Sequence, residues 1–260
     1  MSTLNSAADL DRSLGSLAAQ TFRDFEVILV DGGSADDTLE QAKLLMQASG
    51  LRFRLMLAPG TGIYEAINLG VAVAAGQWLY VMGSDDHLLA PDVFANLSGP
   101  LGRPGQDAVV VHGNVWIEDP GYLYGQPWDL GRLMERNLSH QSAFYRHEVI
   151  RKHGIVYDTK YNLYADWDYN VRMMALGRFV YVPLPVASYG CGGVSSFKKD
   201  VLFLEDRELN TMRYFGWRAC WMMTPDRYAL ALARRPSAAS ALLGGLNRLY
   251  WRVRRVLKLA

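Results

Sequence analysis

The chain has 260 residues, half of them hydrophobic, and a formal net charge of +1. This length and composition exclude a disordered or fibrous protein and predict one α/β domain of ordinary size with an appendage. Two cysteines without CxxC spacing argue against a zinc site or a disulfide framework, and the absence of a long apolar run or a secretion signal favours a cytoplasmic body.

The charge is unevenly distributed. Eight of the 27 Lys and Arg residues lie between positions 227 and 260, where no Asp or Glu occurs, so residues 1–226 carry 19 basic against 26 acidic groups. An acidic body with a basic tail argues against nucleic acid as a partner. It indicates contact with an anionic membrane at one end.

The first half alternates between helical and strand patterns. Residues 25–30 form a β-branched apolar block that is typical of a buried parallel strand. The expected elements are helix 9–19, strand 25–30, helix 36–48, strand 52–57, helix 62–75 and strand 78–82. This alternation predicts a mostly parallel, doubly wound sheet with helices on both faces and ligands at the carboxyl ends of its strands.

The first strand of such a sheet is expected to be truncated. Only four residues precede Asn5, where the approach to the first helix begins. Either the true start lies further upstream, or the sheet lacks most of an inner strand and with it part of a ligand site.

The second half is more irregular. Its expected elements are a helix from about 91, a strand at 108–112, a Gly/Pro/aromatic stretch at 113–128, a helix from about 166 to 176 and a strand at 179–182. No internal repeat or low-complexity segment is present.

Two adjacent carboxylates, Asp85 and Asp86, follow the strand that ends at 82. Carboxylates at this position are costly unless water, a cation or a sugar hydroxyl satisfies them. Mg²⁺ and Mn²⁺ take oxygen ligands, so Asp86 and a substrate diphosphate together make a plausible metal shell. The alternative interpretation is a solvated turn that caps the next helix.

Asp31 follows the strand 25–30 and precedes Gly32 and Gly33. Its carboxylate is suited to hydrogen bonds from the base or ribose of a nucleotide, with the glycines allowing close backbone approach; the alternative is an Asx-capped turn. The chain has neither GxGxxG nor GxxxxGK[ST], which disfavours an NAD-type oxidoreductase and a P-loop protein.

Asp166 and Asp168 flank Trp167 where a helix is expected to begin. One of them is expected to cap this helix, and the other, beside aromatic residues, is a candidate general base. His140 lies in a polar run before apolar residues. It is a candidate contact for a diphosphate or an acceptor, or else a structural hydrogen-bonding group.

Taken together, these residues resemble the family 2 glycosyltransferases, inverting enzymes of GT-A (Rossmann-like) fold, and particularly those that build bacterial surface polysaccharides. The resemblance covers residues 4–200 and rests on the order and spacing of the segments 25–38, 62–70, 75–86, 140–142 and 165–168.

The resemblance implies a role for each matching residue. Asp86 would hold the divalent metal, Mg²⁺ or Mn²⁺, and Asp166 would deprotonate an acceptor hydroxyl that attacks opposite the departing diphosphate, inverting the anomeric configuration. The implied nucleotide-sugar-binding residues are Asp31, Gly33, Asn68, Asp85 and His140. Gly83 stands where many relatives carry another acid, so the metal shell would depend on Asp86, water and phosphate.

The expected organisation is a catalytic domain over residues 1–200 and a helical extension over 201–260. Within the catalytic domain, residues 1–112 form the nucleotide-sugar-binding half and 113–200 the acceptor-binding half. After Pro236 the pattern predicts a basic amphipathic helix, which would either lie peripherally on the inner face of the cell membrane or pack on the domain.

The sequence therefore predicts transfer of a sugar from a nucleoside-diphosphate sugar to a glycan or lipid-linked acceptor in polysaccharide biosynthesis. A catalytically silent GT-A-like nucleotide-binding or scaffold protein is the alternative. The third class, a Rossmann-type oxidoreductase, is disfavoured by the missing glycine fingerprint.

Overall fold

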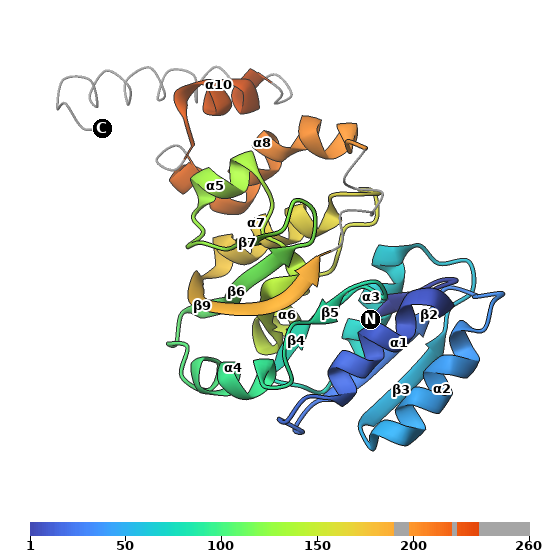
Figure 1. Cartoon of the computed structure of the whole chain (residues 1–260). Coiled ribbons are helices and arrows are strands. Elements are labelled where there is room, and N and C mark those ends of the chain that lie inside the picture. Colours follow the sequence, from blue (N-terminus) through green and yellow to red (C-terminus); the bar gives the residue numbers. More distant parts are fainter. Residues whose placement is uncertain (190–197, 220–222, 234–260) are drawn as a thin grey trace.

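The computed structural model describes residues 1–189, 198–219 and 223–233, which form an α/β structure with two sheets (Figure 1). The smaller sheet and its helices form one end of the molecule in Figure 1, and α8 (Val201–Phe215) and α10 (Pro225–Ala233) lie at the other. No helix among these residues is both long and apolar enough to cross a bilayer.

The smaller sheet is entirely parallel, with strand order β1-β2-β3. Its elements in chain order are β1 (Ser2–Thr3), α1 (Ala7–Ala18), β2 (Glu26–Asp31), α2 (Thr38–Ser49), β3 (Arg52–Leu57) and α3 (Ile63–Val73). Leu10, Leu14 and Leu17 of α1 are buried, as their helical spacing predicts. The predicted alternation is thus confirmed through α3.

The first strand, β1, consists of only two residues, which pair with Val30 and Asp31 of β2. A mostly apolar cavity of about 580 Å³ lies between β2 and β4 (Trp78–Tyr80). The two strands are therefore separated by a space along part of their length.

The second sheet has six strands in the order β4-β8-β6-β9-β5, with β7 paired to β6. The remaining strands are β5 (His87–Leu88), β6 (Ala108–Ile117), β7 (Tyr122–Tyr124), β8 (Ala143–Arg146) and β9 (Arg178–Tyr189). The expected parallel pairing holds here only for β6 with β9. β4, expected to continue the parallel sheet, pairs antiparallel with β8 instead.

Two strands are longer than their apolar blocks suggested. β6 continues to Ile117, and β9 runs from Arg178 to Tyr189. Gly113 lies where the β6–β9 register shifts, and a Cβ at this position would lie 2.5 Å from the backbone oxygen of Leu184. The glycine that resembled a strand end therefore allows the two strands to approach closely.

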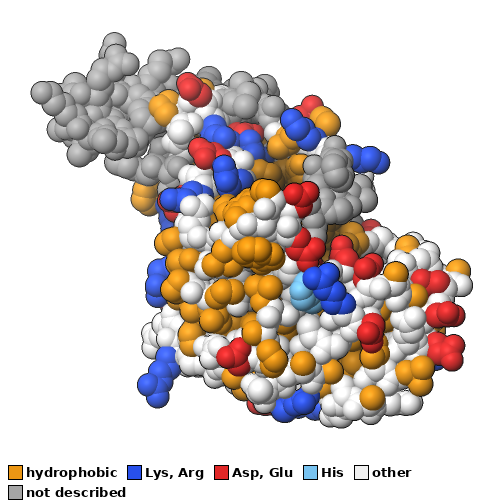
Figure 2. All heavy atoms as spheres, in the orientation of Figure 1, with side chains coloured by type: hydrophobic (Ala, Val, Ile, Leu, Met, Phe, Trp, Pro, Cys, Tyr) orange, Lys and Arg blue, Asp and Glu red, His pale blue; other side chains and the backbone are white. Residues whose placement is uncertain are grey.

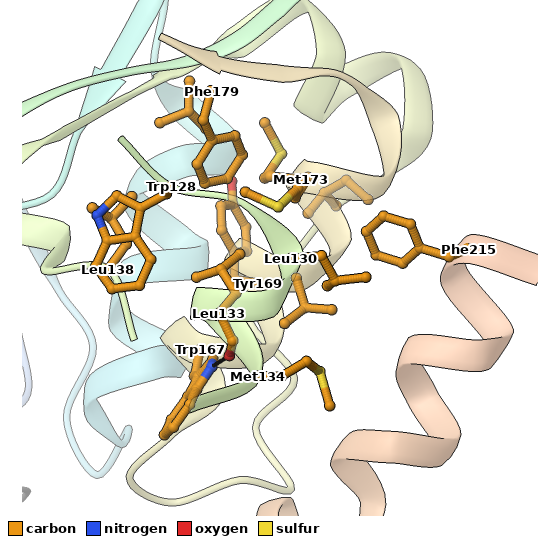
Figure 3. Close-up of a cluster of buried hydrophobic side chains, with 14 of the residues drawn as sticks. Trp128, Leu130, Leu133, Met134, Leu138, Trp167, Tyr169, Met173, Phe179 and Phe215 are labelled. Carbon is orange, nitrogen blue, oxygen red and sulfur yellow. Dashed lines mark hydrogen bonds between the residues drawn. The ribbon is translucent and has the colours of Figure 1, made fainter. Parts of the chain in front are cut away.

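The remaining helices are α4 (Val93–Gly102), α5 (Leu130–Glu135), the short turn η1 (His140–Ser142), α6 (His147–His153), α7 (Ala165–Leu176) and η3 (Gly216–Arg218). Of these, α4, α6, α7 and η1 pack on this second sheet, α5 packs on α7 and η3 packs on α8. The larger core cluster joins α5, α7 and β6, and Figure 3 shows Trp167, Tyr169 and Met173 of α7 within it. Phe203 and Phe215 of α8 belong to the same core.

The start of the predicted helical extension thus shares a core with the preceding residues. The basic amphipathic helix predicted after Pro236 lies outside the described residues, as do Cys191 and Cys220.

Candidate active site

The loop after β4 brings two carboxylates together above Gly83. Asp86 is 3 % exposed; its Oδ2 accepts the backbone N–H of Gly83 at 2.9 Å, and its Oδ1 accepts from Gln141 Nε2 at 3.4 Å. A Cβ added at Gly83 would lie 2.7 Å from Asp85 Oδ1 and 2.8 Å from Asp86 Oδ2. The missing side chain therefore leaves the space into which both carboxylates point.

This pair is chemically suited to a hard cation. Burial raises the pKa of Asp86; nearby His140 opposes the rise and the charge of Asp85 adds to it. No group of three or more His, Cys, Asp or Glu residues in the described segments could hold a metal alone. A Mg²⁺ or Mn²⁺ ion commonly takes one or two carboxylates and completes its shell with water and substrate phosphates, so the pair fits this kind of ion.

Asp166 lies in the first turn of α7 and faces η1. Its Oδ2 accepts from Asn137 Nδ2 at 2.7 Å and lies 3.5 Å from His140 Nδ1. Its Oδ1 accepts the backbone N–H of Trp167 at 2.9 Å and the Tyr64 hydroxyl at 3.4 Å. The side chain remains 16 % exposed, so a ligand can still reach the carboxylate.

Asp168 has a separate, structural role. It is 2 % exposed, its Oδ2 lies 2.8 Å from Arg172 Nε, and its Oδ1 accepts the hydroxyl of Tyr214 at 2.9 Å. Burial raises the pKa of Asp168, and the charge of Arg172 opposes this rise. Asp168 thus fastens α7 to α8, and of the two aspartates only Asp166 is partly exposed.

His140 connects the two carboxylate sites. Burial alone would lower the pKa of His140, but the hydrogen bond and charge of Asp166, with the charges of Asp86 and Asp85, raise it overall. The structure therefore gathers four predicted site residues from three elements: the loop after β4, η1 and α7. This arrangement is suited chemically to a cation beside an anion, and both Asp85 and Asp166 remain accessible to a ligand.

We expect Asp166→Asn to lower the pKa of His140. The substitution removes the carboxylate that contributes a hydrogen bond and a charge, while the burial that lowers this pKa remains. An NMR titration of the histidine ring protons measures the change, with His153 on the exposed end of α6 as a reference in the same spectrum. An unchanged titration of His140 would show that the two side chains are not coupled.

Asp31 is fully buried and closes its own turn. Its Oδ1 accepts the backbone N–H groups of Gly33 and Ser34 at 2.9 Å, and its Oδ2 accepts the Ser34 hydroxyl. This is the Asx turn considered as the alternative interpretation. Gly33 adopts φ +102° and a Cβ there would lie 3.2 Å from Pro59, so this position requires glycine.

Ser6 links the Asp31 loop to the acidic loop, which is the loop after β4 that carries Asp85 and Asp86. The Ser6 hydroxyl shares a 2.8 Å hydrogen bond with the Ser84 hydroxyl, and its backbone N–H donates to Thr38 Oγ1 at 2.8 Å. Residues near the carboxyl ends of β2 and β4 are therefore linked, although the Asp31 carboxylate itself points into its own loop.

Asn68, predicted as a donor contact, pairs with protein backbone in the structure. Its Nδ2 donates to the backbone oxygen of Tyr157 at 2.9 Å, and its Oδ1 accepts the backbone N–H of Tyr157 at 2.8 Å. A side-chain amide matches a backbone amide in this way because each has one donor group and one acceptor. Asn68 thus joins α3 to the segment before α7 and orients it.

Replacing Asn68 with alanine is expected to destabilise the protein by about 2 kcal/mol, because two hydrogen bonds of about 1 kcal/mol each are lost. Donor affinity should remain near that of the parent, since the amide faces protein backbone. Urea unfolding and donor calorimetry on the same samples check both parts. A stable variant that no longer binds donor would show that Asn68 contributes to donor binding.

Three neighbours of the site were not predicted: Tyr64, Asn137 and Gln141. Tyr64 and Gln141 lie inside segments that carried the family resemblance. The sequence therefore indicated that these segments matter, but it did not indicate a role for either residue. Asn137 precedes His140 by three residues, and nothing in its local pattern distinguishes it from a surface asparagine.

Comparison with solved structures identifies the fold. Residues 1–349 of S. aureus TarS superpose with a TM-score of 0.68 at 16 % identity, covering 90 % of this chain and 85 % of that one. The mannosyltransferase PcManGT from Pyrobaculum calidifontis, solved with GDP-Man and Mn²⁺, gives a TM-score of 0.60 at 17 % identity, covering 96 % and 78 %. The fold is that of a GT-A glycosyltransferase, as predicted.

The family follows from sequence. The model of Glycosyl transferase family 2 matches residues 1–159, and the chain belongs to this family. It is 38 % identical over 213 residues to a PGL/p-HBAD biosynthesis glycosyltransferase of Mycobacterium bovis, covering 80 % of this chain and 82 % of the relative. The amylovoran biosynthesis glycosyltransferase AmsB of Erwinia amylovora is 27 % identical over 204 residues, covering 71 % and 66 %. The chain is thus a glycosyltransferase of glycan biosynthesis.

Proposed function

We propose that this glycosyltransferase moves a sugar, with inversion, from a nucleoside-diphosphate sugar to a glycan or lipid-linked acceptor. One observation carries the proposal: Asp86, His140 and Asp166, distant in sequence, meet at one site. A carboxylate pair, a histidine of raised pKa and a partly exposed carboxylate match the needs of a metal, a diphosphate and an attacking hydroxyl.

The donor would lie across the acidic loop. Asp86, with Asp85 beside it, would hold Mg²⁺ or Mn²⁺ against the diphosphate, and the bound metal would offset the negative charge that grows on this leaving group. His140, with its raised pKa, would add positive charge next to the same phosphates. Asp31 and Gly33 would shape the loop that receives the nucleoside. Asn68 would support the opposite side of the donor site by holding the backbone of Tyr157.

Asp166 would act as the general base. Its carboxylate takes the proton of an acceptor hydroxyl as the hydroxyl oxygen forms a bond to the anomeric carbon. The bond from this carbon to the diphosphate breaks at the opposite side, and its electron pair leaves with the diphosphate. Attack and departure on opposite faces invert the anomeric configuration.

The acceptor half is assigned to residues 113–200. The hairpin of β6 and β7 exposes Trp116, Tyr122 and Leu123, and hydrophobic side chains gather over it in Figure 2. Exposed aromatic rings suit sugar faces and apolar aglycones. The names of two relatives, for PGL/p-HBAD and amylovoran biosynthesis, support a polysaccharide or glycolipid acceptor. Together with the basic tail, a lipid-linked acceptor of this kind favours sugar transfer at the cytoplasmic face of a membrane.

The experiment that tests the proposal is hydrolysis of nucleotide sugars without an acceptor. Purified protein with Mn²⁺ is incubated with uridine, guanosine and thymidine diphosphate sugars, and release of the nucleoside diphosphate is followed. Slow, metal-dependent release from one member is expected, because water can replace the acceptor hydroxyl. Binding of a donor without any turnover, even with glycan acceptors present, would favour the silent scaffold.

A further inference from the structure

A chain of side-chain hydrogen bonds runs from the buried core to the partly exposed Asp166. The Tyr145 hydroxyl donates to Asn170 Oδ1 at 2.9 Å, and Asn170 Nδ2 donates to Asn137 Oδ1 at 2.9 Å. Asn137 Nδ2 in turn donates to Asp166 Oδ2 at 2.7 Å. Every member donates toward the carboxylate, so the hydrogen bonds point in one direction and polarise one another.

The direction of the chain is set by a backbone carbonyl. Asn170 Nδ2 also donates to the backbone oxygen of Leu138 at 3.3 Å, and a carbonyl can only accept. The amide of Asn170 is therefore held with its nitrogen toward Leu138 and Asn137. Asn137 must then turn its oxygen toward Asn170, which leaves its N–H group for Asp166.

Burial makes this arrangement costly to break. Asn170 is fully buried and Tyr145 is 1 % exposed, so a flipped amide would leave polar groups without partners in the core. Asn170 follows Asp166 by four residues, which places both on one face of α7. The neighbouring face of α7 is packed into the large core cluster around Leu138 and Tyr169 (Figure 3).

Asn137 lies in the segment that leads into η1. It lies three residues before His140 and four before Gln141, and these two residues contact or approach Asp166 and Asp86. Through its hydrogen bonds with Asp166 and Asn170, the Asn137 side chain joins the segment that leads into η1 to α7.

We propose that Asn137 and Asn170 are positioning residues for the base, holding the Asp166 carboxylate with Oδ2 turned toward η1. This inference rests on the proposed function, in which Asp166 takes the proton of the acceptor. Asn137 fixes the carboxylate by direct contact, and Asn170 acts through Asn137. The shortest hydrogen bonds to Asp166 are 2.7 Å at Oδ2 and 2.9 Å at Oδ1, and the side chain remains 16 % exposed, so an acceptor hydroxyl can still reach the carboxylate.

The test compares Asn137→Ala and Asn170→Leu with Tyr161→Phe. Tyr161 is also fully buried in the large core, and its hydroxyl bonds Asp206 and Asn210, so its substitution gives a matched loss of core hydrogen bonds away from Asp166. Donor hydrolysis is measured with the nucleotide sugar that the parent releases fastest. We expect kcat to fall about 10- to 100-fold in both asparagine variants, with KM for the donor within about twofold. Tyr161→Phe should keep the parent kcat.

A second readout does not require turnover. The pKa of His140, measured by NMR titration, should change in Asn137→Ala and stay at the parent value in Tyr161→Phe, because only the first variant frees the carboxylate that faces His140. Asparagine variants with parental kcat and an unchanged His140 titration would overturn the inference. So would a loss of kcat that merely follows the loss of unfolding free energy in all three variants.

Asp166→Asn in the same series separates the two proposals. If this variant turns over donor as the parent does, the assignment of the base fails. If it is inactive while both asparagine variants keep parental kcat, the base assignment stands and the positioning role fails.

Discussion

Replacing Asp166 with asparagine is expected to lower sugar transfer by about 10³-fold, the usual contribution of a general base. The amide has nearly the shape of the carboxylate and cannot accept a proton at neutral pH. Donor affinity should change by no more than about twofold, because a general base, the proposed role of Asp166, acts in the chemical step. Rates of transfer or donor hydrolysis, measured beside donor affinity, show whether the two effects separate.

A matched control is Asp107→Asn. Asp107 is exposed and pairs with Arg178 Nε at 3.2 Å, and within the described residues it makes no hydrogen bond or ion pair with Asp85, Asp86 or Asp166. This variant removes a carboxylate of the same type and should keep the parent rate. If Asp166→Asn retained more than about a tenth of the parental rate, general-base catalysis of the expected size by Asp166 would be excluded.

The second large effect concerns Asp86. Asp86→Ala is expected to abolish the part of donor binding that depends on Mg²⁺ or Mn²⁺, a loss of about 100-fold or more in affinity at saturating metal. The reason is that Asp86 is the buried member of the carboxylate pair, and Asp85 alone leaves the ion one exposed ligand. Donor titrations with and without metal measure this loss.

Gly83→Ala distinguishes geometry from charge at the same loop. It keeps both carboxylates, but its Cβ would lie within 2.8 Å of an oxygen of each, so they must move apart. We expect metal-dependent donor binding to weaken about tenfold. The matched control is Gly15→Ala in α1, where a Cβ meets nothing within 4 Å. Parental affinity in Gly83→Ala would mean that the carboxylates do not act together.

The order of elements could be predicted because helix and strand periods are local. The helices α1, α2 and α3 and the strands β2 and β3 lie close to the positions that their apolar patterns indicated. Strand pairing could not be predicted, since β4 finds its partner in β8, more than sixty residues later. Gly113 shows why strand length was also missed: a glycine that resembles a turn in sequence can serve a close strand approach.

The acidic residues of the site could be found in sequence because each follows a strand or opens a helix. The partners of these acidic residues could not be found in sequence, because Asn137 and Gln141 contact them only when η1 is folded against α7 and the acidic loop. The donor contact of Asn68 remains a prediction, and the structure adds a contact that its local pattern did not indicate. Its amide matches the backbone of Tyr157.

The central claim is that metal-dependent binding of the donor needs Asp86, whereas Asp166 is needed only for transfer of the sugar. Isothermal calorimetry of the best nucleotide sugar, with and without Mn²⁺, on the parent, Asp86→Ala and Asp166→Asn tests it most directly. The account predicts metal-dependent binding in the parent and in Asp166→Asn, and none in Asp86→Ala. Equal metal-dependent binding by Asp86→Ala and the parent would contradict it.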